Sequence, residues 1–222
     1  MQIRTQPQKS WCLSCWEKME WVRSPLCQKC GRPYRDSPSS SDHLCGDCID
    51  STFHFDAARS AALHEGTIRA RIHQLKFGAR LEWIPPLVEL LLIANAGLGL
   101  PGPDLILPVP LHIKRLRERG FNQSGMLAGK LAREIHAPVS HNTLIRKNQT
   151  QPQTRLKRAE RLENVKGAFA ISDVKKILGR RILLVDDVFT TGTTLSECAR
   201  TLKKHGGAKE VRAITVTRAL PD

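Results

Sequence analysis

The sequence predicts an α/β fold with an open, mostly parallel sheet from about residue 53 onward, preceded by a small cysteine-rich zinc domain. Two observations predict it. Residues 182–185 form a short, continuously apolar run, typical of a strand buried on both faces of a parallel sheet, and a helical pattern and a second apolar run follow. Ahead of residue 53, six cysteines form three Cys-x-x-Cys pairs. We therefore expect two domains, residues 1–52 and residues 53–222.

The composition fits a folded, basic protein. The chain has 222 residues, of which 41% are hydrophobic and 25% charged, so it can bury a sizeable core. Lys and Arg outnumber Asp and Glu by 35 to 21, a net charge of +14, which favours nucleic acid, phosphorylated metabolites or an acidic membrane surface as partners. Aromatic residues make up only 5%, so no platform for stacking bases is evident. The first ten residues lack the apolar core of a signal peptide, and the most apolar helix candidate, 84–96, is too short to span a bilayer. We expect a cytoplasmic protein without a membrane span.

The cysteine pairs predict a metal site. In a reducing compartment, pairs at this spacing indicate zinc ligands rather than disulfides, and two pairs can converge on one tetrahedral Zn²⁺. We predict that four thiolates close a structural site: Cys27, Cys30, Cys45 and Cys48. Cys12 and Cys15 then have no site, share a second one with His43 or His54, or exchange into the first. A redox role for one pair is the alternative.

The next elements follow from hydrophobic periodicity. We expect a strand at 55–63, a helix at 67–75 with Ile68, Ile72 and Leu75 on one face, and a second helix at 82–96. Residues 97–102 match Gly-x-Gly-x-x-Gly, but they follow a helix and precede a strand, the reverse of the dinucleotide-binding order. A core strand is predicted at 105–109.

A basic segment follows that strand. Four cations precede Gly120, and a helix continues through Ile135. Cations beside a strand end are well placed to neutralise a pyrophosphate, and the candidate residues are Val109, Pro110, Leu111, Arg117 and Arg119. The solvated face of a basic helix is the alternative.

Two carboxylates, Asp186 and Asp187, follow the apolar run at 182–185, and a hydroxyl-rich turn then opens a helix. Backbone N–H groups and the helix dipole make such a turn a phosphate cradle, and Gly192 allows close approach. Because carboxylates repel phosphate, they suit a vicinal diol or hydrated Mg²⁺ instead. A ribose beside a 5′-phosphate satisfies both parts. The alternatives are a buried strand with a polar turn, or a nucleotide hydrolase, although residues 125–131 fall short of its phosphate loop. We expect Cys198, in the helix, to be a small core residue.

This pattern resembles the phosphoribosyl-pyrophosphate (PRPP) signature of type I phosphoribosyltransferases. The resemblance implies that the two aspartates face the ribose hydroxyls, that Mg²⁺ accompanies PRPP, and that the loop residues Thr190, Thr191, Gly192, Thr193 and Thr194 hold the 5′-phosphate. The long, polar, basic segment after Ile145 resembles by position the mobile loop that covers the leaving pyrophosphate. Arg146, Arg155 and Arg158 of this segment are candidate catalytic residues, in addition to Asp186 and Asp187. A plain charged helix over residues 154–162 is the alternative.

A narrower resemblance covers nearly the whole chain. Pro-Val-Pro-Leu at 108–111, Arg-Gly-Phe-Asn-Gln at 119–123, Leu-Lys-Phe-Gly at 75–78 and the cysteine pairs are similar to the ComF/GntX family of zinc-finger phosphoribosyltransferase-like proteins. Relatives often carry a further Cys-x-x-Cys before the first pair seen here, and its absence favours the last four cysteines as ligands. The resemblance implies a role in uptake of single-stranded DNA during natural transformation, with that DNA and the competence machinery as partners. The alternatives are a metabolic phosphoribosyltransferase acting on a base or amine, and a PRPP sensor without turnover. The residues specify neither the acceptor nor the oligomeric state.

Overall fold

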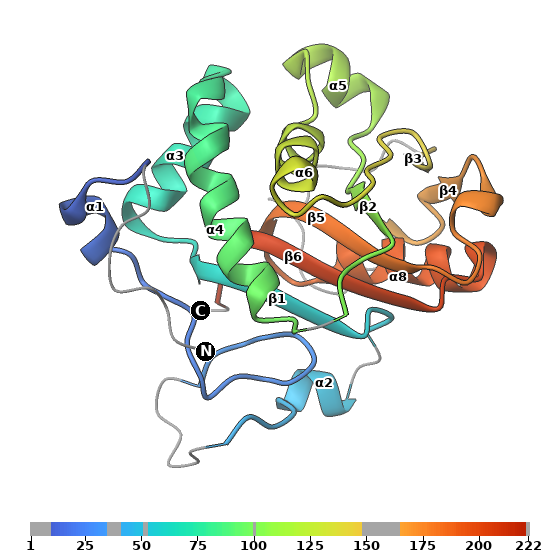
Figure 1. Ribbon diagram of the computed structural model, residues 1–222, viewed down its shortest axis with the longest axis horizontal. Coiled ribbons are helices and arrows are strands. Elements are labelled where there is room, and N and C mark those ends of the chain that lie inside the picture. Colours follow the sequence, from blue (N-terminus) through green and yellow to red (C-terminus); the bar gives the residue numbers. More distant parts are fainter. Residues whose placement is uncertain (1–9, 35–40, 51–52, 100, 148–164, 221–222) are drawn as a thin grey trace.

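The protein is organised around one parallel sheet. The computed structural model describes residues 10–34, 41–50, 53–99, 101–147 and 165–220. Within them, four parallel strands lie in the order β1–β6–β5–β2 (Figure 1). Their bounds are β1 Ala57–Leu63, β2 Leu105–Pro108, β5 Arg181–Phe189 and β6 Glu210–Arg218. The predicted α/β class and parallel sheet are confirmed.

Strand β5 lies inside the sheet, between β6 and β2. Its apolar run at 182–185 is at most 2% exposed, because helices or loops cover both faces, which explains why its sequence does not alternate. The strand is longer than predicted. It continues in register with β6 through the two aspartates to Phe189, which pairs with Arg218.

Helices cover both faces of the sheet. On one face lie α3 (Gly66–Gly78), α4 (Ile84–Ala96, after the 3₁₀ turn Leu81–Trp83) and α6 (Gln123–Glu134). The other face holds α8 (Thr193–Gly206) and an antiparallel pair, β3 (Leu144–Arg146) with β4 (Phe169–Ile171). The short elements are α1 (Leu13–Glu17), α2 (Gly46–Asp50), α5 (Ile113–Arg119) and the 3₁₀ turn Val174–Lys176. None of the helices in the described segments is long and apolar enough for a transmembrane span.

The predicted apolar faces are buried. Ile68, Ile72 and Leu75 of α3 are at most 2% exposed, and Cys198 of α8 is fully buried in the core, as expected. The main difference concerns the basic segment, part of which forms helix α5. Gly120, with φ of +79°, caps this helix in the left-handed conformation.

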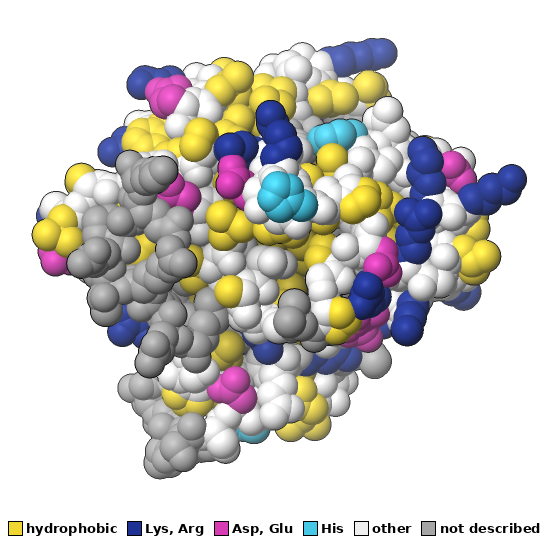
Figure 2. Space-filling view, in the orientation of Figure 1, with side chains coloured by type: hydrophobic (Ala, Val, Ile, Leu, Met, Phe, Trp, Pro, Cys, Tyr) yellow, Lys and Arg dark blue, Asp and Glu magenta, His cyan; other side chains and the backbone are white. Residues whose placement is uncertain are grey.

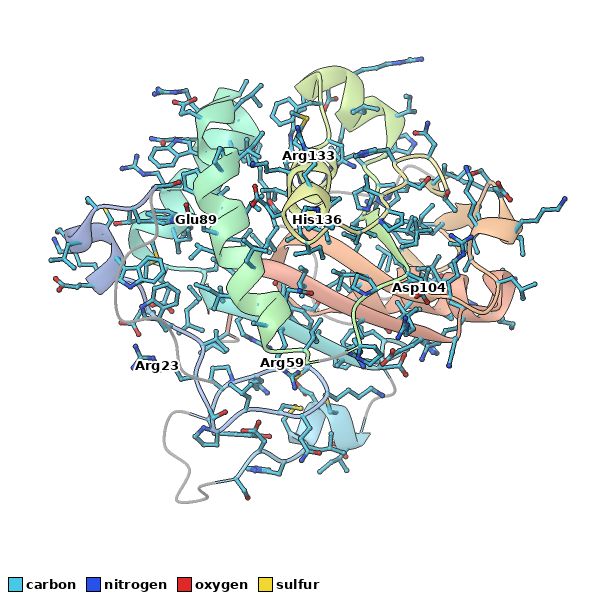
Figure 3. The ribbon with its side chains drawn as sticks, viewed as in Figure 1. Arg23, Arg59, Glu89, Asp104, Arg133 and His136 are labelled. Atoms are coloured by element: carbon cyan, nitrogen blue, oxygen red, sulfur yellow. The ribbon has the colours of Figure 1, made fainter. Side chains whose placement is uncertain are left out.

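The cysteine-rich segment covers the open edge of β1. Three backbone hydrogen bonds of 2.7–2.9 Å join them, from Ala58 N–H to Lys29 O, from Val22 N–H to Ala61 O and from Leu63 N–H to Glu20 O. Arg59, labelled in Figure 3, also donates to the carbonyl of Gln28 at 3.0 Å. Gly31 fits because its φ is +71° and an added Cβ would lie 2.5 Å from the carbonyl oxygen of Ala58. The segment therefore protects an otherwise unpaired strand edge.

Candidate functional site

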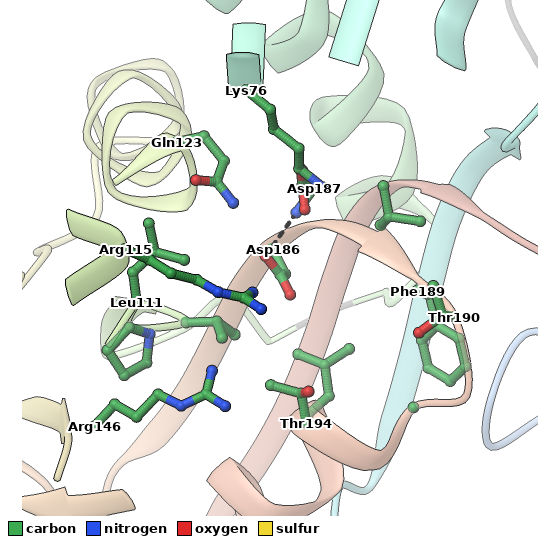
Figure 4. Close-up of a pocket in the computed structure, with 15 residues that line it drawn as sticks. Lys76, Leu111, Arg115, Gln123, Arg146, Asp186, Asp187, Phe189, Thr190 and Thr194 are labelled. Atoms are coloured by element: carbon green, nitrogen blue, oxygen red, sulfur yellow. Dashed lines mark hydrogen bonds and ion pairs between the residues drawn. The ribbon is translucent and has the colours of Figure 1, made fainter. Parts of the chain in front are cut away.

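A cleft of about 260 Å³ opens at the carboxyl ends of β2 and β5. In open α/β sheets this is where ligands bind. Figure 4 shows side chains entering it from several elements. The lining residues are Lys76 of α3, Val109, Pro110, Leu111, Arg115 of α5, Gln123 of α6, Arg146 of β3, Asp186, Asp187, Val188, Phe189, Thr190, Gly192, Thr194 and Leu195.

The two aspartates are the acidic part of the cleft. Neighbouring strand residues project to opposite faces, so each carboxylate meets different partners. Asp187 is 3% exposed and forms an ion pair with Lys76, at 2.5 Å between Oδ2 and Nζ. Asp186 accepts a hydrogen bond of 2.6 Å from the hydroxyl of Ser124 and one of 3.0 Å from the backbone N–H of Asp187. Because buried carboxylates are costly without partners, Lys76 and Ser124 are integral to the site.

Asp186 titrates near neutrality. Desolvation raises the pKa of its carboxyl to about 7, and repulsion from Asp187 acts in the same direction. The hydrogen bond from Ser124 and the charge of Lys76 oppose the rise. A hydroxyl donor or a divalent cation beside this carboxyl would favour its ionised form. Asp186 is therefore suited to bind a ligand that donates a hydrogen bond to it or carries positive charge.

The hydroxyl-rich loop forms the opposite wall, at the N-terminus of α8. Thr190, Gly192 and Thr194 line the cleft, whereas the hydroxyls of Thr191 and Thr193 hydrogen-bond to each other at 2.8 Å. Gly192 has φ of +75°, and an added Cβ would lie 2.5 Å from Cζ of Phe189. The first N–H groups of a helix have no intrahelical acceptors, so this end of α8 can hold a phosphate.

Two guanidinium groups supply positive charge. Arg115 and Arg146 extend into the cleft from the side across from Thr190 (Figure 4). Burial lowers the pKa of Arg146, and repulsion from Arg115 lowers it further, although arginine stays protonated. An anion between the two groups would relieve this repulsion. Beside the strand end at 109–111, they can neutralise a pyrophosphate.

The cleft gathers most of the site residues predicted from the sequence. It is lined by Asp186, Asp187, Thr190, Gly192, Thr194, Arg146, Val109, Pro110 and Leu111. Arg117 lies on the exposed side of α5, and Arg119 donates to Oε1 of Gln123 at 2.5 Å instead of lining the cleft. Arg155 and Arg158 lie outside the described residues.

Four residues of the site were not predicted: Lys76, Arg115, Gln123 and Ser124. Three of them carried a signal. Lys76 belongs to Leu-Lys-Phe-Gly and Gln123 to Arg-Gly-Phe-Asn-Gln, two of the segments that carry the family resemblance, and Arg115 belongs to the basic segment. Side chains in a helix point toward its N-terminus, so the first-turn Arg115 reaches back to the strand end. Arg117, two residues later, lies on the opposite, exposed side of the helix. Recognising α5 as a helix would have favoured Arg115.

The four predicted cysteine ligands form a structural zinc site. Their Sγ atoms lie within 4.8 Å of one another and all four residues are buried. The Sγ atoms of Cys30 and Cys45 are 3.7 Å apart, close to the roughly 3.8 Å edge of a tetrahedron with Zn–S bonds of 2.3 Å. Backbone N–H groups of Cys30 and Cys45 donate to Sγ of Cys27 at 3.4 Å. Among the described residues, no comparable group of ligands includes Cys12 or Cys15.

One buried arginine connects the zinc site with the phosphate loop. Arg218, 3% exposed, donates from Nη1 to the carbonyl of Cys30 at 2.8 Å. Its Cζ lies 4.8 Å from the ring centroid of Phe189, the ring that packs under Gly192. The zinc knuckle and the loop are therefore parts of one packed structure.

Known proteins resemble both parts of the chain. A phosphoribosyl transferase domain model matches residues 122–220, and a double zinc ribbon domain model matches residues 2–49. "DNA utilization protein YhgH" of Escherichia coli O157:H7 is 36% identical over 188 residues, which cover 82% of this chain and 80% of that protein. "Competence protein F" of Haemophilus influenzae is 29% identical, covering 94% and 96%. "Competence protein ComFC" of Bacillus subtilis is 31% identical, covering 96% and 86%.

The cysteine geometry predicts one zinc per chain. Protein purified without added zinc should contain one equivalent by elemental analysis, and Cys45→Ser should lose it because three thiolates no longer fill the tetrahedron. Cys12→Ser and Cys15→Ser are the matched controls and should keep one equivalent. Full zinc content in Cys45→Ser would contradict the assignment.

Asp186 predicts a pH dependence of stability. Its pKa is raised by folding, from about 3.9 in an unfolded chain. Its contribution is therefore fully present below pH 4 and is lost as pH rises through 7. Asp186→Asn removes this loss. The free energy of unfolding of the variant, measured by urea denaturation, should therefore rise relative to that of the wild type as the pH is raised from 5 to 8.

Asp104 provides the control for that experiment. Hydrogen bonds from Arg181 lower the pKa of Asp104 to about 2, so its contribution is complete above about pH 4. Asp104→Asn should shift the free energy of unfolding by a constant amount between pH 5 and 8. If Asp186→Asn also ran parallel to the wild type, the titration of Asp186 would have to be abandoned.

Proposed function

The chain belongs to the ComF family, and from this premise we propose that its cleft binds PRPP, or another ribose 5-phosphate, together with Mg²⁺. We propose further that this site serves the handling of single-stranded DNA during natural transformation, in the cytoplasm. Structural zinc holds the N-terminal segment against the sheet that carries the site.

A single observation carries the first part of the proposal: the acidic pair and the hydroxyl-rich loop line one cleft. Asp186 and Asp187 would accept hydrogen bonds from the ribose diol, directly or through hydrated Mg²⁺. The N-terminus of α8, with Thr190 and Thr194, would hold the 5′-phosphate. Arg115 and Arg146 would lie beside the pyrophosphate. A ribose phosphate thus has a complementary group for each of its parts.

Phosphoribosyl transfer is the second candidate function, and the arginine pair favours it. When pyrophosphate leaves the ribose C1, negative charge grows on the departing oxygens, and fixed guanidinium groups would stabilise that charge. In this second function, the proposed role of Arg155 and Arg158 is to cover the leaving pyrophosphate. A nitrogen nucleophile would complete the transfer, and without one the same cleft would act as a PRPP sensor.

The DNA part of the proposal is supported by charge and by the relatives. The chain carries a net charge of +14, and Figure 2 shows lysine and arginine side chains along the edge of the molecule where β4 and α8 lie. Exposed cations at this end are Lys175, Lys176, Arg180, Lys204 and Lys209. Two of the relatives are named a DNA utilization protein and a competence protein. Phosphates of a single strand would be attracted to such a surface.

PRPP with Mg²⁺ should stabilise the wild type against heat. At about 100 times Kd, binding contributes about 2.7 kcal/mol, which for a chain of this size raises Tm by about 5–10 °C. The double variant Asp186→Asn/Asp187→Asn should shift by less than about 2 °C, since it cannot hold the diol or the metal ion. Asp104→Asn, a carboxylate outside the cleft, should shift like the wild type. Equal shifts in the double variant would refute the site.

Affinity for single-stranded DNA should fall steeply as salt is raised. Each phosphate contact contributes a slope of about −0.7 in a plot of log affinity against log salt concentration, so several contacts give a slope of −2 or steeper. Fluorescence anisotropy with a labelled oligonucleotide measures it. Reversing the charges of Lys175 and Lys176 to Glu should flatten the slope, whereas a salt-independent affinity would count against the DNA role.

A further inference from the structure

Phe77 is an unusual residue for the rim of a polar cleft. Its side chain lies near the C-terminal end of α3, directly after Lys76, and it is 69% exposed. The other hydrophobic residues at this end of α3 are buried, Leu75 completely. Single exposed hydrophobic residues are common in proteins, so exposure alone assigns no role. The contacts of the ring give the additional information.

Two sets of contacts place the ring beside the cleft. Lys76, its neighbour in sequence, reaches Asp187 inside the cleft at 2.5 Å. On the other side, the guanidinium of Arg119 lies 5.3 Å from the ring centroid and donates to Gln123, which lines the cleft and is only 4% exposed. Figure 4 shows Lys76 and Gln123 entering the cleft from the same side, above the two aspartates. Phe77 therefore lies at the rim above the acidic pair, away from the phosphate loop.

The surroundings of the ring are cationic. The His73 ring is centred 4.5 Å from that of Phe77, one turn back along α3. Helix α5, which supplies Arg119, carries four cations and one acid: Lys114, Arg115, Arg117 and Arg119 with Glu118. An exposed aromatic ring beside a cluster of cations is the combination by which proteins bind single-stranded nucleic acids, stacking a base on the ring and attracting the backbone phosphates.

We propose that Phe77 is a stacking platform for a base of single-stranded DNA, beside the sugar-phosphate cleft. The proposal rests on the proposed function, because it assigns the base and the ribose phosphate to neighbouring places on one rim. Arg119 is a positioning residue in this arrangement, since it holds the ring and Gln123 together. The low aromatic content of the sequence gave no indication of such a platform.

The test compares two oligonucleotides of about 12 nucleotides, oligo-dT and an abasic strand with the same phosphates. Anisotropy should show that the wild type prefers oligo-dT. Phe77→Leu keeps an apolar side chain without a π-face, and it should lower affinity for oligo-dT by about 5- to 150-fold, the range for one stacked base. Affinity for the abasic strand should stay unchanged. Phe77→Trp should keep the preference for oligo-dT.

Leu13→Ala is the control, because Leu13 of α1 is 56% exposed, does not line the cleft and does not lie among the cations proposed to contact DNA; it should behave as the wild type. The PRPP-induced rise in Tm separates the two proposals. If PRPP stabilises Phe77→Leu like the wild type and oligo-dT affinity is unchanged, the platform is overturned and the proposed function stands. If PRPP does not stabilise the wild type while Phe77→Leu still lowers affinity for oligo-dT, the sugar-phosphate site fails and the platform stands. Phe77-dependent binding of thymidine without any effect on oligo-dT would replace DNA by a small acceptor and overturn the proposal.

Discussion

Two neighbouring carboxylates at the end of a buried strand are the constraint on which the site depends. Asp186 and Asp187 cannot both be charged and buried at this position without compensation. Helix α3 supplies it with Lys76 and helix α6 with Ser124, so the packing of both helices is tied to the chemistry of the cleft. A ligand with hydroxyls and phosphates meets an acidic floor, a loop of N–H groups and two guanidinium groups.

The zinc-binding segment is part of the same packed structure as the cleft. It forms hydrogen bonds with the backbone of β1, and Arg218 links the carbonyl of Cys30 to the ring of Phe189. That ring occupies the space that a side chain at position 192 would need. The shape of the loop therefore depends on packing that begins at the metal ligands, although no cysteine lies in the cleft.

Local chemistry made part of this predictable from the sequence. Four features can be interpreted from a few neighbouring residues alone: the apolar run of β5, its two aspartates, the glycine in the loop and the four cysteines. Lys76 and Gln123 lie in segments that carry the family resemblance, but their place in the cleft depends on the packing of α3 and α6, which those segments do not specify. Helix α5 was only the alternative interpretation of the basic segment, since its seven residues offer only Ile113 and Leu116 as apolar positions. Phe77 lay just beyond the predicted helix, in the Leu-Lys-Phe-Gly segment, and its exposure and its neighbours became known only from the structure.

The position of β1 has a consequence for the order in which the protein is built. Its partner within the sheet is β6, the last strand of the chain, whereas its other edge contacts segments that precede it. During synthesis the zinc segment can dock on β1 as soon as both have left the ribosome. The opposite edge of β1 stays open until β6 has been synthesised, because pairing of distant segments has to wait for both of them. Early metal binding would thus halve the strand surface that a nascent chain offers to its neighbours for aggregation.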